Sequence, residues 1–458
     1  MTVVEQASCV GGRAPLVDLP GGTGRYRLDT GPTVLTEIPL LARCFAAVGE
    51  RIEDRLELRP LDPAYQARFA DGSSLDLVSD RTRMRDAIHE LAGPADAAGY
   101  DRFADHVERL YDAVMPRFID HNLDGPASII GPALARVAAL GGFRRLGPLV
   151  ASFFEDERLR RAFSFQALYA GVSPARALGL FAVISAMDIG HGVFYPRGGM
   201  HAVPAAMADA ARAHGVCVSL GERVERIEQQ PAGHLVHTDA RTLTTDAVVL
   251  TAEPAHSLAL LGRAPRRRTT PSPSCVLLAA GVRGLPPGGA HHRIHFGRTW
   301  DEVFADLAEG RLMRDPSFLV SVPTRSDPDL APPGRDVLYA LFPAPAEVDD
   351  APRLDWERLR PIYREQMLHH LAAAGYTGLE IEAEQLITPA DWSARGMPAG
   401  TPFSAAHTFW QSGPFRQPNV VAPGVVLAGS GTTPGVGVPM VLISGRLAAE
   451  RLTGARRT

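Results

Sequence analysis

Residues 425–439 read Val425-Val426-Leu427-Ala428-Gly429-Ser430-Gly431-Thr432-Thr433-Pro434-Gly435-Val436-Gly437-Val438-Pro439. This stretch carries the strongest local signal for the fold. Its four leading apolar residues are typical of a buried strand, the glycines predict a turn, and residues 440–452 predict a helix. Glycines let backbone approach a ligand closely, and a helix N-terminus offers free N–H groups and partial positive charge to an anion. The unit is therefore either a ligand-binding turn or a turn that only packs against a sheet.

The other end of the chain opens with Thr2-Val3-Val4-Glu5, a short strand that ends in a carboxylate, and continues to Gly11-Gly12-Arg13. In dinucleotide-binding folds, an acid that binds the adenosine ribose follows the glycine-rich phosphate turn by about 20 residues. No Gly-x-Gly-x-x-Gly occurs in this sequence. Glu5 is therefore either a ribose ligand that lacks its usual partner turn or an ordinary glutamate at a strand end.

Between these ends, the apolar spacing predicts mainly helices from about residue 39 to 191, including one over 101–118. Short strands are expected over 216–220, 224–227, 235–238 and 247–251, and a second mixed region over 273–422. The longest apolar run, from Ala177 to Met187, is closed by Arg176 and Asp188 and is too short to span a membrane.

Composition excludes several classes of protein. The chain has 458 residues and a mass of 49.1 kDa, enough for two or three domains. It contains no lysine, so all 47 basic residues are arginine, and mechanisms that need a lysine, such as pyridoxal-phosphate, P-loop and protein-kinase chemistry, are excluded. The net charge of -4 gives no general attraction to nucleic acid, and Arg266-Arg267-Arg268 is interpreted as a solvated loop. Four widely spaced cysteines favour a reducing, cytoplasmic compartment.

Several segments, in this order, carry a resemblance to a known family: 4–6 with 11–14, 29–34, 154–160 with 162–165, 194–200, 401–404 and the turn that begins at Gly429. On these segments the chain resembles bacterial carotenoid desaturases of the phytoene desaturase type, flavoproteins related to the amine oxidases. The resemblance covers essentially the whole chain. The turn at Gly429 and the segment Tyr195 to Gly199 are specific in combination.

The resemblance implies an α/β fold with a discontinuous, Rossmann-like FAD-binding domain formed by residues 1–40, 195–262 and 420–458. Residues 41–194 and 263–419 are expected to form an α+β domain that binds substrate and associates with a membrane. The implied FAD-binding residues are Glu5 for the ribose, Gly11, Gly12 and Arg13 along the pyrophosphate and flavin, Val224 for adenine through its backbone, and Gly429, Gly431, Pro434, Gly435, Gly437, Val438 and Pro439 around the isoalloxazine. The helix N-terminus after the turn is suited to the negative charge of a reduced flavin.

The family also has a first strand and a glycine-rich turn ahead of the ribose acid. On that spacing, about 25 to 30 residues are expected before Met1. Their absence indicates a start codon assigned too late or a truncated copy.

The implied reaction is FAD-dependent desaturation of phytoene toward lycopene in carotenoid biosynthesis, with a hydride transferred from the polyene to flavin N5. The proton left on the neighbouring carbon is acidic enough for water or a weak base, so no catalytic acid or base is nominated. Asp124 and the run Glu155-Asp156-Glu157 are interpreted as surface or helix-cap residues. Two alternatives stay open: another carotenoid-modifying or amine-oxidising flavoenzyme of this fold, and an inactive, truncated paralogue that binds isoprenoids.

A hydrocarbon substrate of this kind is dissolved in membrane, so we expect an apolar tunnel and a cytoplasmic protein that associates peripherally with lipid. Apolar residues recur every three to four positions between Ile129 and Phe154, with Arg136, Arg144 and Arg145 among them. They form either core helices or a membrane contact. Phe163, Phe165 and Tyr169 are interpreted as tunnel or plain core residues. His291, His292 and His295 lack acidic or thiol residues at ligand spacing, so no metal site is expected.

Overall fold

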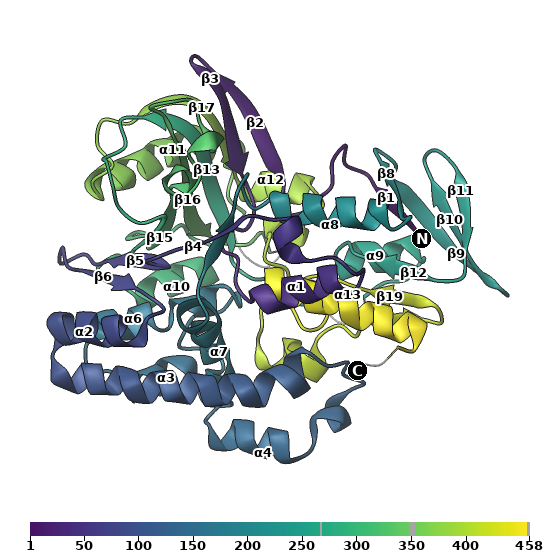
Figure 1. Cartoon of the computed structure of the whole chain (residues 1–458), viewed down its shortest axis with the longest axis horizontal. Helices are drawn as coiled ribbons and strands as arrows, with labels where there is room; N and C mark the ends of the chain where they lie inside the picture. Colours follow the sequence, from purple (N-terminus) through teal and green to yellow (C-terminus); the bar gives the residue numbers. More distant parts are fainter. Residues whose placement is uncertain (266–267, 349–352, 456–458) are drawn as a thin grey trace.

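The computed structural model describes residues 1–265, 268–348 and 353–455, and its largest element is a mostly antiparallel sheet (Figure 1). Seven strands form this sheet in the order β17 (Glu380–Ile387), β13 (Ser274–Arg283), β16 (Asp336–Ala344), β15 (Phe318–Ser321), β14 (His292–His295), β5 (Tyr65–Arg68) and β6 (Ser74–Leu77). Nine of the ten residues of β13 are buried, because side chains on both of its faces pack into clusters. One cluster is completed by α11 (Trp356–Ala373).

Strands from three distant parts of the chain meet on the other side of the molecule (Figure 1). Two parallel pairs form there: β1 (Thr2–Glu5) with β8 (Cys217–Leu220), and β12 (Val248–Leu250) with β19 (Val425–Leu427). Every strand predicted over residues 216–251 is confirmed, as is the strand before the glycine-rich turn. This meeting of segments is what a discontinuous domain requires. Its predicted boundaries, and the strand and turn expected ahead of Met1, stay predictions.

The remaining strands are short and complete small sheets. A meander joins β9 (Val224–Gln230), β10 (Gly233–Thr238) and β11 (Thr242–Thr245), and β18 (Val420–Ala422) flanks β19. Two further pairs are β2 (Leu16–Gly21) with β3 (Gly24–Asp29), and β4 (Leu58–Pro60) with β7 (Phe194–Pro196).

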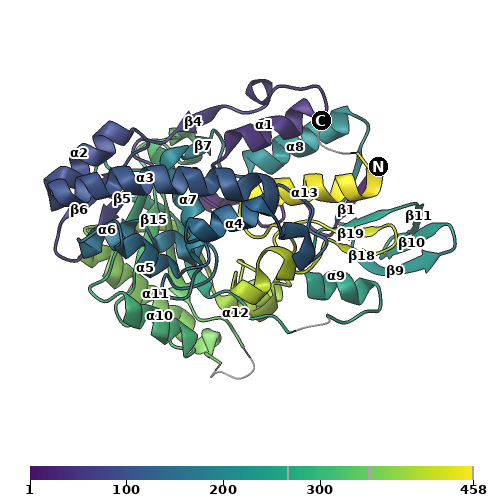
Figure 2. The same ribbon diagram turned by 90° about the horizontal axis from the view of Figure 1, so that it is seen from below.

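The predicted helix over 101–118 is confirmed within α3 (Pro94–Val114), which starts earlier because Pro94 suits a first helical turn, and which continues as a π-helical turn over Met115–Ile119. The helix after the glycine-rich turn is α13 (Val438–Thr453). Both views of the ribbon place it beside α1 (Ile38–Ala46), and Leu40 and Leu447 share one core cluster (Figures 1 and 2). The other helices are α2 (Arg81–Ala92), α4 (Pro132–Ala139), α5 (Leu146–Ala151), α6 (Glu157–Ala162), α7 (Val183–Ser185), α8 (Ala202–Ala213), α9 (Pro254–Leu260), α10 (Asp301–Ala308) and α12 (Pro389–Ala394).

The amphipathic segment over 129–154 contains both buried core positions and exposed apolar positions that could contact a membrane. Val137, Leu146 and Val150 are buried in the core, whereas Ile130 is 75% exposed and Phe143 is 40% exposed. Within the described ranges, no helix is both long and apolar enough to cross a bilayer.

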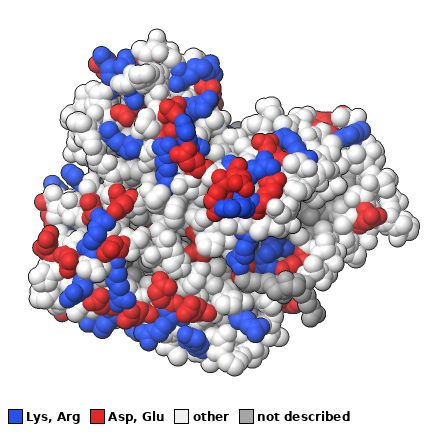
Figure 3. Space-filling model, in the orientation of Figure 1, with Lys and Arg blue, Asp and Glu red and all other residues white. Residues whose placement is uncertain are grey.

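Charges of both signs are interspersed on the face shown in Figure 3, where arginines lie among acidic side chains. Ion pairs accompany these charges elsewhere in the described residues too, since Arg81 pairs with Asp101 and Asp105. Two residues of the basic run 266–268, Arg266 and Arg267, lie outside the described residues. The predicted lack of a nucleic-acid partner stays a prediction.

Candidate functional site

The glycine-rich turn lies between β19 and α13 and folds back onto the start of that helix. The Gly429 N–H donates to Ser444 Oγ at 3.0 Å, and the Ser444 hydroxyl donates to the Thr433 carbonyl at 2.9 Å. Gly429, Gly435 and Gly437 have φ values of 112°, 145° and 115°, which side chains disfavour. A Cβ at Gly435 would also collide with the ring of His407. The turn therefore needs glycine at these positions.

Arg416 holds the turn from within the protein, where its side chain is buried. Its Nε donates to the Thr432 carbonyl at 3.0 Å, and Nη2 donates to the Ser430 carbonyl at 2.6 Å. Burial lowers the pKa of Arg416 to about 10, while the charge of Glu253 acts in the opposite direction. The guanidinium thus stays protonated at neutral pH and fixes the two carbonyls of the turn.

Arg13 connects the N-terminal segment to the same turn. Its Nη1 donates to Ser430 Oγ at 2.7 Å and to Ser404 Oγ at 3.0 Å, and its Nη2 pairs with Glu253 Oε1 at 2.5 Å. Glu253 is the residue before α9, and the Ser404 hydroxyl also donates to it. Four segments of the chain thus meet at one guanidinium. The predicted site residues Arg13 and the turn after Gly429 are brought together.

The segment before Arg13 packs against other parts of the chain that carry the family resemblance. His201 Nδ1 lies 2.9 Å from the Ala14 carbonyl, and a Cβ at Gly11 would lie 2.9 Å from that nitrogen. The Asp29 carboxylate accepts hydrogen bonds from the Tyr195 hydroxyl at 2.8 Å and the Met200 N–H at 2.9 Å. Burial raises the pKa of Asp29, and these hydrogen bonds oppose the shift. Segments 11–14, 29–31 and 195–201 therefore pack against one another.

Within the described part of the chain, Glu5 and Val224 make their contacts with other strands and not with the glycine-rich turn. Glu5 ends β1 opposite Leu220, and its side chain accepts the Ala7 N–H at 2.8 Å. Val224 begins β9 and pairs with Thr238. In the described ranges, no hydrogen bond or ion pair joins either residue to the glycine-rich turn. Their link is Glu222, whose N–H donates to the Glu5 carbonyl at 3.0 Å and which lies two residues before Val224.

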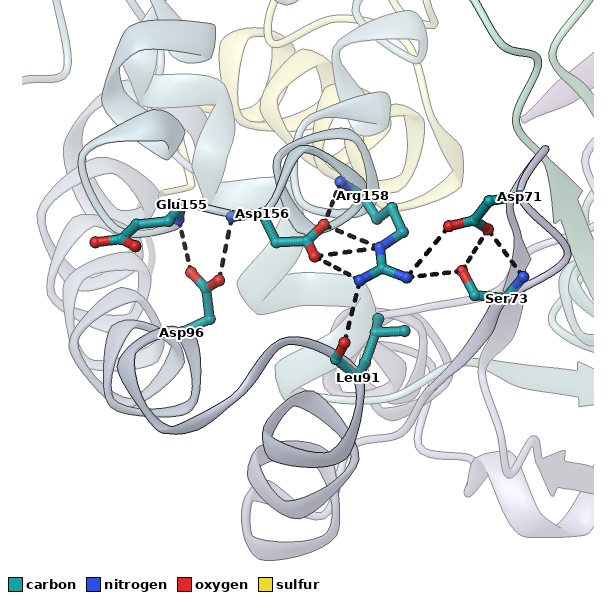
Figure 4. Close-up of polar contacts among 7 residues, drawn as sticks. All are labelled: Asp71, Ser73, Leu91, Asp96, Glu155, Asp156 and Arg158. Atoms are coloured by element: carbon teal, nitrogen blue, oxygen red, sulfur yellow. Dashed lines mark hydrogen bonds and ion pairs between the residues drawn. The ribbon is translucent and has the colours of Figure 1, made fainter.

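The carboxylates weighed in the sequence lie at the surface or cap a helix, as predicted, and Figure 4 shows the contacts around Asp156. Asp156 caps α6 by accepting the Arg158 N–H at 2.7 Å and pairs with its guanidinium at 2.6 Å. Asp96 accepts the N–H groups of Glu155 and Asp156 at 2.7 Å and 3.1 Å. Asp124 is exposed and pairs with Arg451.

The histidines weighed as metal ligands have hydroxyl partners. His291, His292 and His295 bond Ser326, Ser321 and Tyr376 at 2.8 Å, 2.7 Å and 3.1 Å. Burial lowers the pKa of all three, to about 3 for His292 and His295. Across the described residues, no group of three His, Cys, Asp or Glu side chains is placed to hold a metal ion.

Sequence reasoning missed Glu253, Arg416 and His407. Glu253 had a local signal, because it follows the predicted strand over 247–251 and precedes a proline that suits the start of a helix. Arg416 and His407 had none, because their importance comes from burial against parts of the turn that no sequence pattern connects to them.

Comparison with known proteins identifies the family of this arrangement. A family model described as flavin containing amine oxidoreductase matches residues 1–453. The chain belongs to this family. It is therefore a flavin-dependent oxidoreductase, and both the predicted α/β flavoprotein fold and the resemblance are confirmed.

Individual relatives show where in the family the chain lies. It is 53% identical to the phytoene dehydrogenase of Streptomyces griseus, over 100% of this chain and 91% of that protein. It is 34% identical to the zeta-carotene-forming phytoene desaturase of Myxococcus xanthus, over 98% of this chain and 88% of that protein. A solved oxidoreductase structure from Methanosarcina mazei has the same fold, with a TM-score of 0.62 at 16% identity over 98% of this chain and 94% of that one.

Proposed function

We propose that this protein is an FAD-dependent desaturase that converts phytoene toward lycopene. The observation that carries the proposal is the meeting of Arg13, Glu253 and Ser430 at the glycine-rich turn, in a chain whose relatives are named phytoene dehydrogenase and phytoene desaturase. The bound flavin supplies a hydride acceptor at N5, which the protein's side chains lack. Arg13, Glu253 and Ser430 contribute by positioning the groups around that flavin.

Two glycines near the site are not crowded by neighbouring atoms. A Cβ built at Gly12, just before Arg13, would meet nothing within 4 Å, and one at Gly437 in the turn would make only ordinary van der Waals contact, with its nearest atom at 3.8 Å. The N-terminus of α13 faces the end of this turn and would favour the negative charge of a reduced ring, and Arg13 lies at its other side. We infer that Gly429, Gly431, Pro434, Gly435, Gly437, Val438 and Pro439 surround the isoalloxazine.

The remaining cofactor contacts follow from the position of the N-terminal strands. We propose that Glu5 binds the FAD ribose, that Val224 binds adenine through its backbone, and that Gly11 and Gly12 lie along the pyrophosphate. Glu5 is suited to this role for two reasons. Its carboxylate accepts the Ala7 N–H and is open to further partners. It also lies at the carboxyl end of the parallel pair formed by β1 and β8, and nucleotides bind at that end in such folds.

The substrate enters from lipid, and an exposed aromatic patch supports a membrane contact. The aromatic patch consists of Phe143, Phe409 and Trp410, which are 40%, 40% and 66% exposed. The Phe143 and Phe409 rings lie 6.4 Å apart although they are far apart in sequence. The exposed Arg136, Arg144 and Arg145 lie on the same segment as Phe143. Apolar side chains beside arginines are suited to an anionic membrane surface.

The test is conversion of phytoene by purified protein with FAD in liposomes, followed by product chromatography. We expect coloured polyenes, with lycopene as the end product rather than the zeta-carotene for which the Myxococcus xanthus relative is named. Turnover of amines in place of phytoene by the flavin-loaded protein would contradict the proposal. Accumulation of zeta-carotene alone would retain the desaturase and correct its product.

A further inference from the structure

Asp188 is a buried carboxyl that nothing in the described residues satisfies. It lies in η6 (Ala186–Gly190), a π-helical turn that continues α7, and it is 2% exposed. Neither of its carboxyl oxygens has a hydrogen-bond partner. The carboxyl lies beside the N–H groups of Ile189 and of Asp188 itself, the Tyr65 hydroxyl and the Gln166 amide, without a hydrogen bond of ordinary geometry to any of them. π-helical turns of this kind occur frequently at functional sites.

The groups around Asp188 are unsatisfied as well. Both amide atoms of Gln166 and the Ser185 hydroxyl are buried without a partner. Burial of an unpaired polar group destabilises a fold, so such a cluster needs a function or a bound partner to account for it. Phe165 packs on Tyr65 and Tyr169, with ring centroids 5.7 Å and 5.8 Å apart, so the surroundings are otherwise apolar and aromatic. Apolar and aromatic side chains are chemically suited to contact a polyene.

The cluster is connected to the glycine-rich turn through a series of packed residues. The Tyr169 hydroxyl is 3.5 Å from the Tyr65 hydroxyl, which borders Asp188. The next residue, Ala170, accepts the His407 N–H through its carbonyl at 2.8 Å. The His407 ring fills the space above Gly435, in the turn itself. Asp188 is thus joined to the turn by a short chain of contacting residues.

We propose that Asp188 is the base that takes the proton in desaturation. The assignment rests on the proposed function. One C–H bond of the polyene breaks and its hydrogen leaves with both electrons as a hydride to the flavin. The C–H bond on the adjacent carbon then breaks, its proton passes to an oxygen of the Asp188 carboxylate, and its electron pair becomes the new C=C π bond. Asp188 loses the proton again before the next turnover.

Burial supports this role. It raises the pKa of Asp188 well above the ordinary value, and a carboxylate with a raised pKa is a stronger base than an ordinary one. Tyr65 and Tyr169 face the carboxyl, and burial raises the pKa of both, so they stay neutral. His292 packs on Tyr65 and is also neutral, because burial lowers its pKa to about 3.

The other titratable groups near η6 lie around His191, the residue that follows this turn. On α3, which packs against η6, Tyr111 donates to Glu37, and Glu108 pairs with His191. The hydrogen bond to Glu37 raises the pKa of His191. His191 is therefore a second titratable group beside η6, and a test has to separate it from Asp188.

The test compares pH–rate profiles of the flavin-loaded protein on phytoene in liposomes. Asp188→Asn should lower turnover by about 100-fold or more and remove the limb along which the rate rises with pH. Asp188→Glu should restore part of the rate. His191→Gln should keep that limb. The matched control is Asp96→Asn, another buried carboxyl, whose partners are backbone N–H groups and which should leave the shape of the profile unchanged.

Thermal unfolding gives a second readout that needs no turnover. A buried carboxyl with a raised pKa contributes stability that is complete at low pH and is lost as pH rises through the folded-state pKa. Asp188→Asn should therefore have a higher Tm than the wild type at pH 8, with a difference that shrinks toward pH 4. A carboxylate with a purely structural role would give a lower Tm at pH 8.

Two results overturn the assignment. One is turnover by Asp188→Asn within twofold of the wild type, and the other is loss of the limb in His191→Gln but not in Asp188→Asn. Failure of the wild-type protein to desaturate phytoene would instead contradict the proposed function, and the assignment with it.

Discussion

At the scale of single residues, Arg13 is the side chain on which the site depends most directly. Arg13→Gln removes the ion pair with Glu253 and the charged donor to Ser430. Hydrogen bonds to charged groups contribute about 1.5 to 3 kcal/mol, so we expect FAD to bind about 10- to 100-fold more weakly. Titration of the apoprotein with FAD measures this. Arg25→Gln, which breaks an exposed pair with Asp18, is the control and should not change the affinity. Equal affinities of Arg13→Gln and wild type would remove Arg13 from the site.

Arg416 is expected to contribute to the stability of the fold. Its guanidinium is buried and donates to the carbonyls of Ser430, Thr432, Ala405 and Gln411. Arg416→Met leaves these acceptors without their donor, and we expect it to lower the free energy of unfolding by about 3 to 5 kcal/mol. Arg416→Lys should recover little, because an ammonium cannot reach the same set of carbonyls. Urea denaturation followed by circular dichroism checks both variants. A loss below 1 kcal/mol would contradict the role.

At the scale of elements, the strand, turn and helix over 425–453 determine the site. Gly435→Ala would place a methyl group on the His407 ring at a φ of 145°, so we expect a folded protein with at least tenfold weaker FAD binding or a loss of stability of about 1 to 3 kcal/mol. Flavin titration and thermal unfolding measure the two effects.

The matched control lies in the same element. Gly445 is within α13, and a Cβ there meets nothing within 4 Å. Gly445→Ala should therefore stabilise the helix by about 0.5 to 1 kcal/mol. Identical behaviour of the two variants would show that the turn has no special requirement for glycine.

Elements are also where sequence reasoning succeeded most. The strands over 216–251, the helix after Pro439 and the cap role of Asp156 depend on local spacing and local hydrogen bonds, so a single sequence predicts them. The Arg13–Glu253 pair joins residues 240 positions apart, and the buried Arg416 donates to carbonyls of residues 405, 411, 430 and 432. In the sequence, Asp188 only marks the end of an apolar run. Its carboxyl is buried without a partner because the chain folds Tyr65 and Gln166 against it, and no local pattern predicts this contact. Long-range packing determines these contacts, and no local pattern encodes it.

At the scale of the whole molecule, the aromatic patch connects the site to its substrate. A double variant, Phe409→Ser with Trp410→Ser, should lower binding to anionic liposomes by about tenfold, since each buried apolar side chain contributes about 1 kcal/mol or more. Flavin binding should stay unchanged. Co-sedimentation with liposomes measures the effect, and Val249→Ser, at an exposed apolar position outside the patch, is the control. Equal sedimentation of the double variant and the wild type would place the membrane contact elsewhere.

In the proposed reaction, the bound flavin accepts a hydride from a polyene. Anaerobic mixing of the FAD-loaded protein with phytoene in liposomes, followed by absorbance, tests it most directly. We predict that the oxidised flavin band bleaches while new polyene absorbance appears, with one double bond formed for each flavin reduced. A flavin that remains oxidised beside bound phytoene, but bleaches with an amine, would contradict the claim.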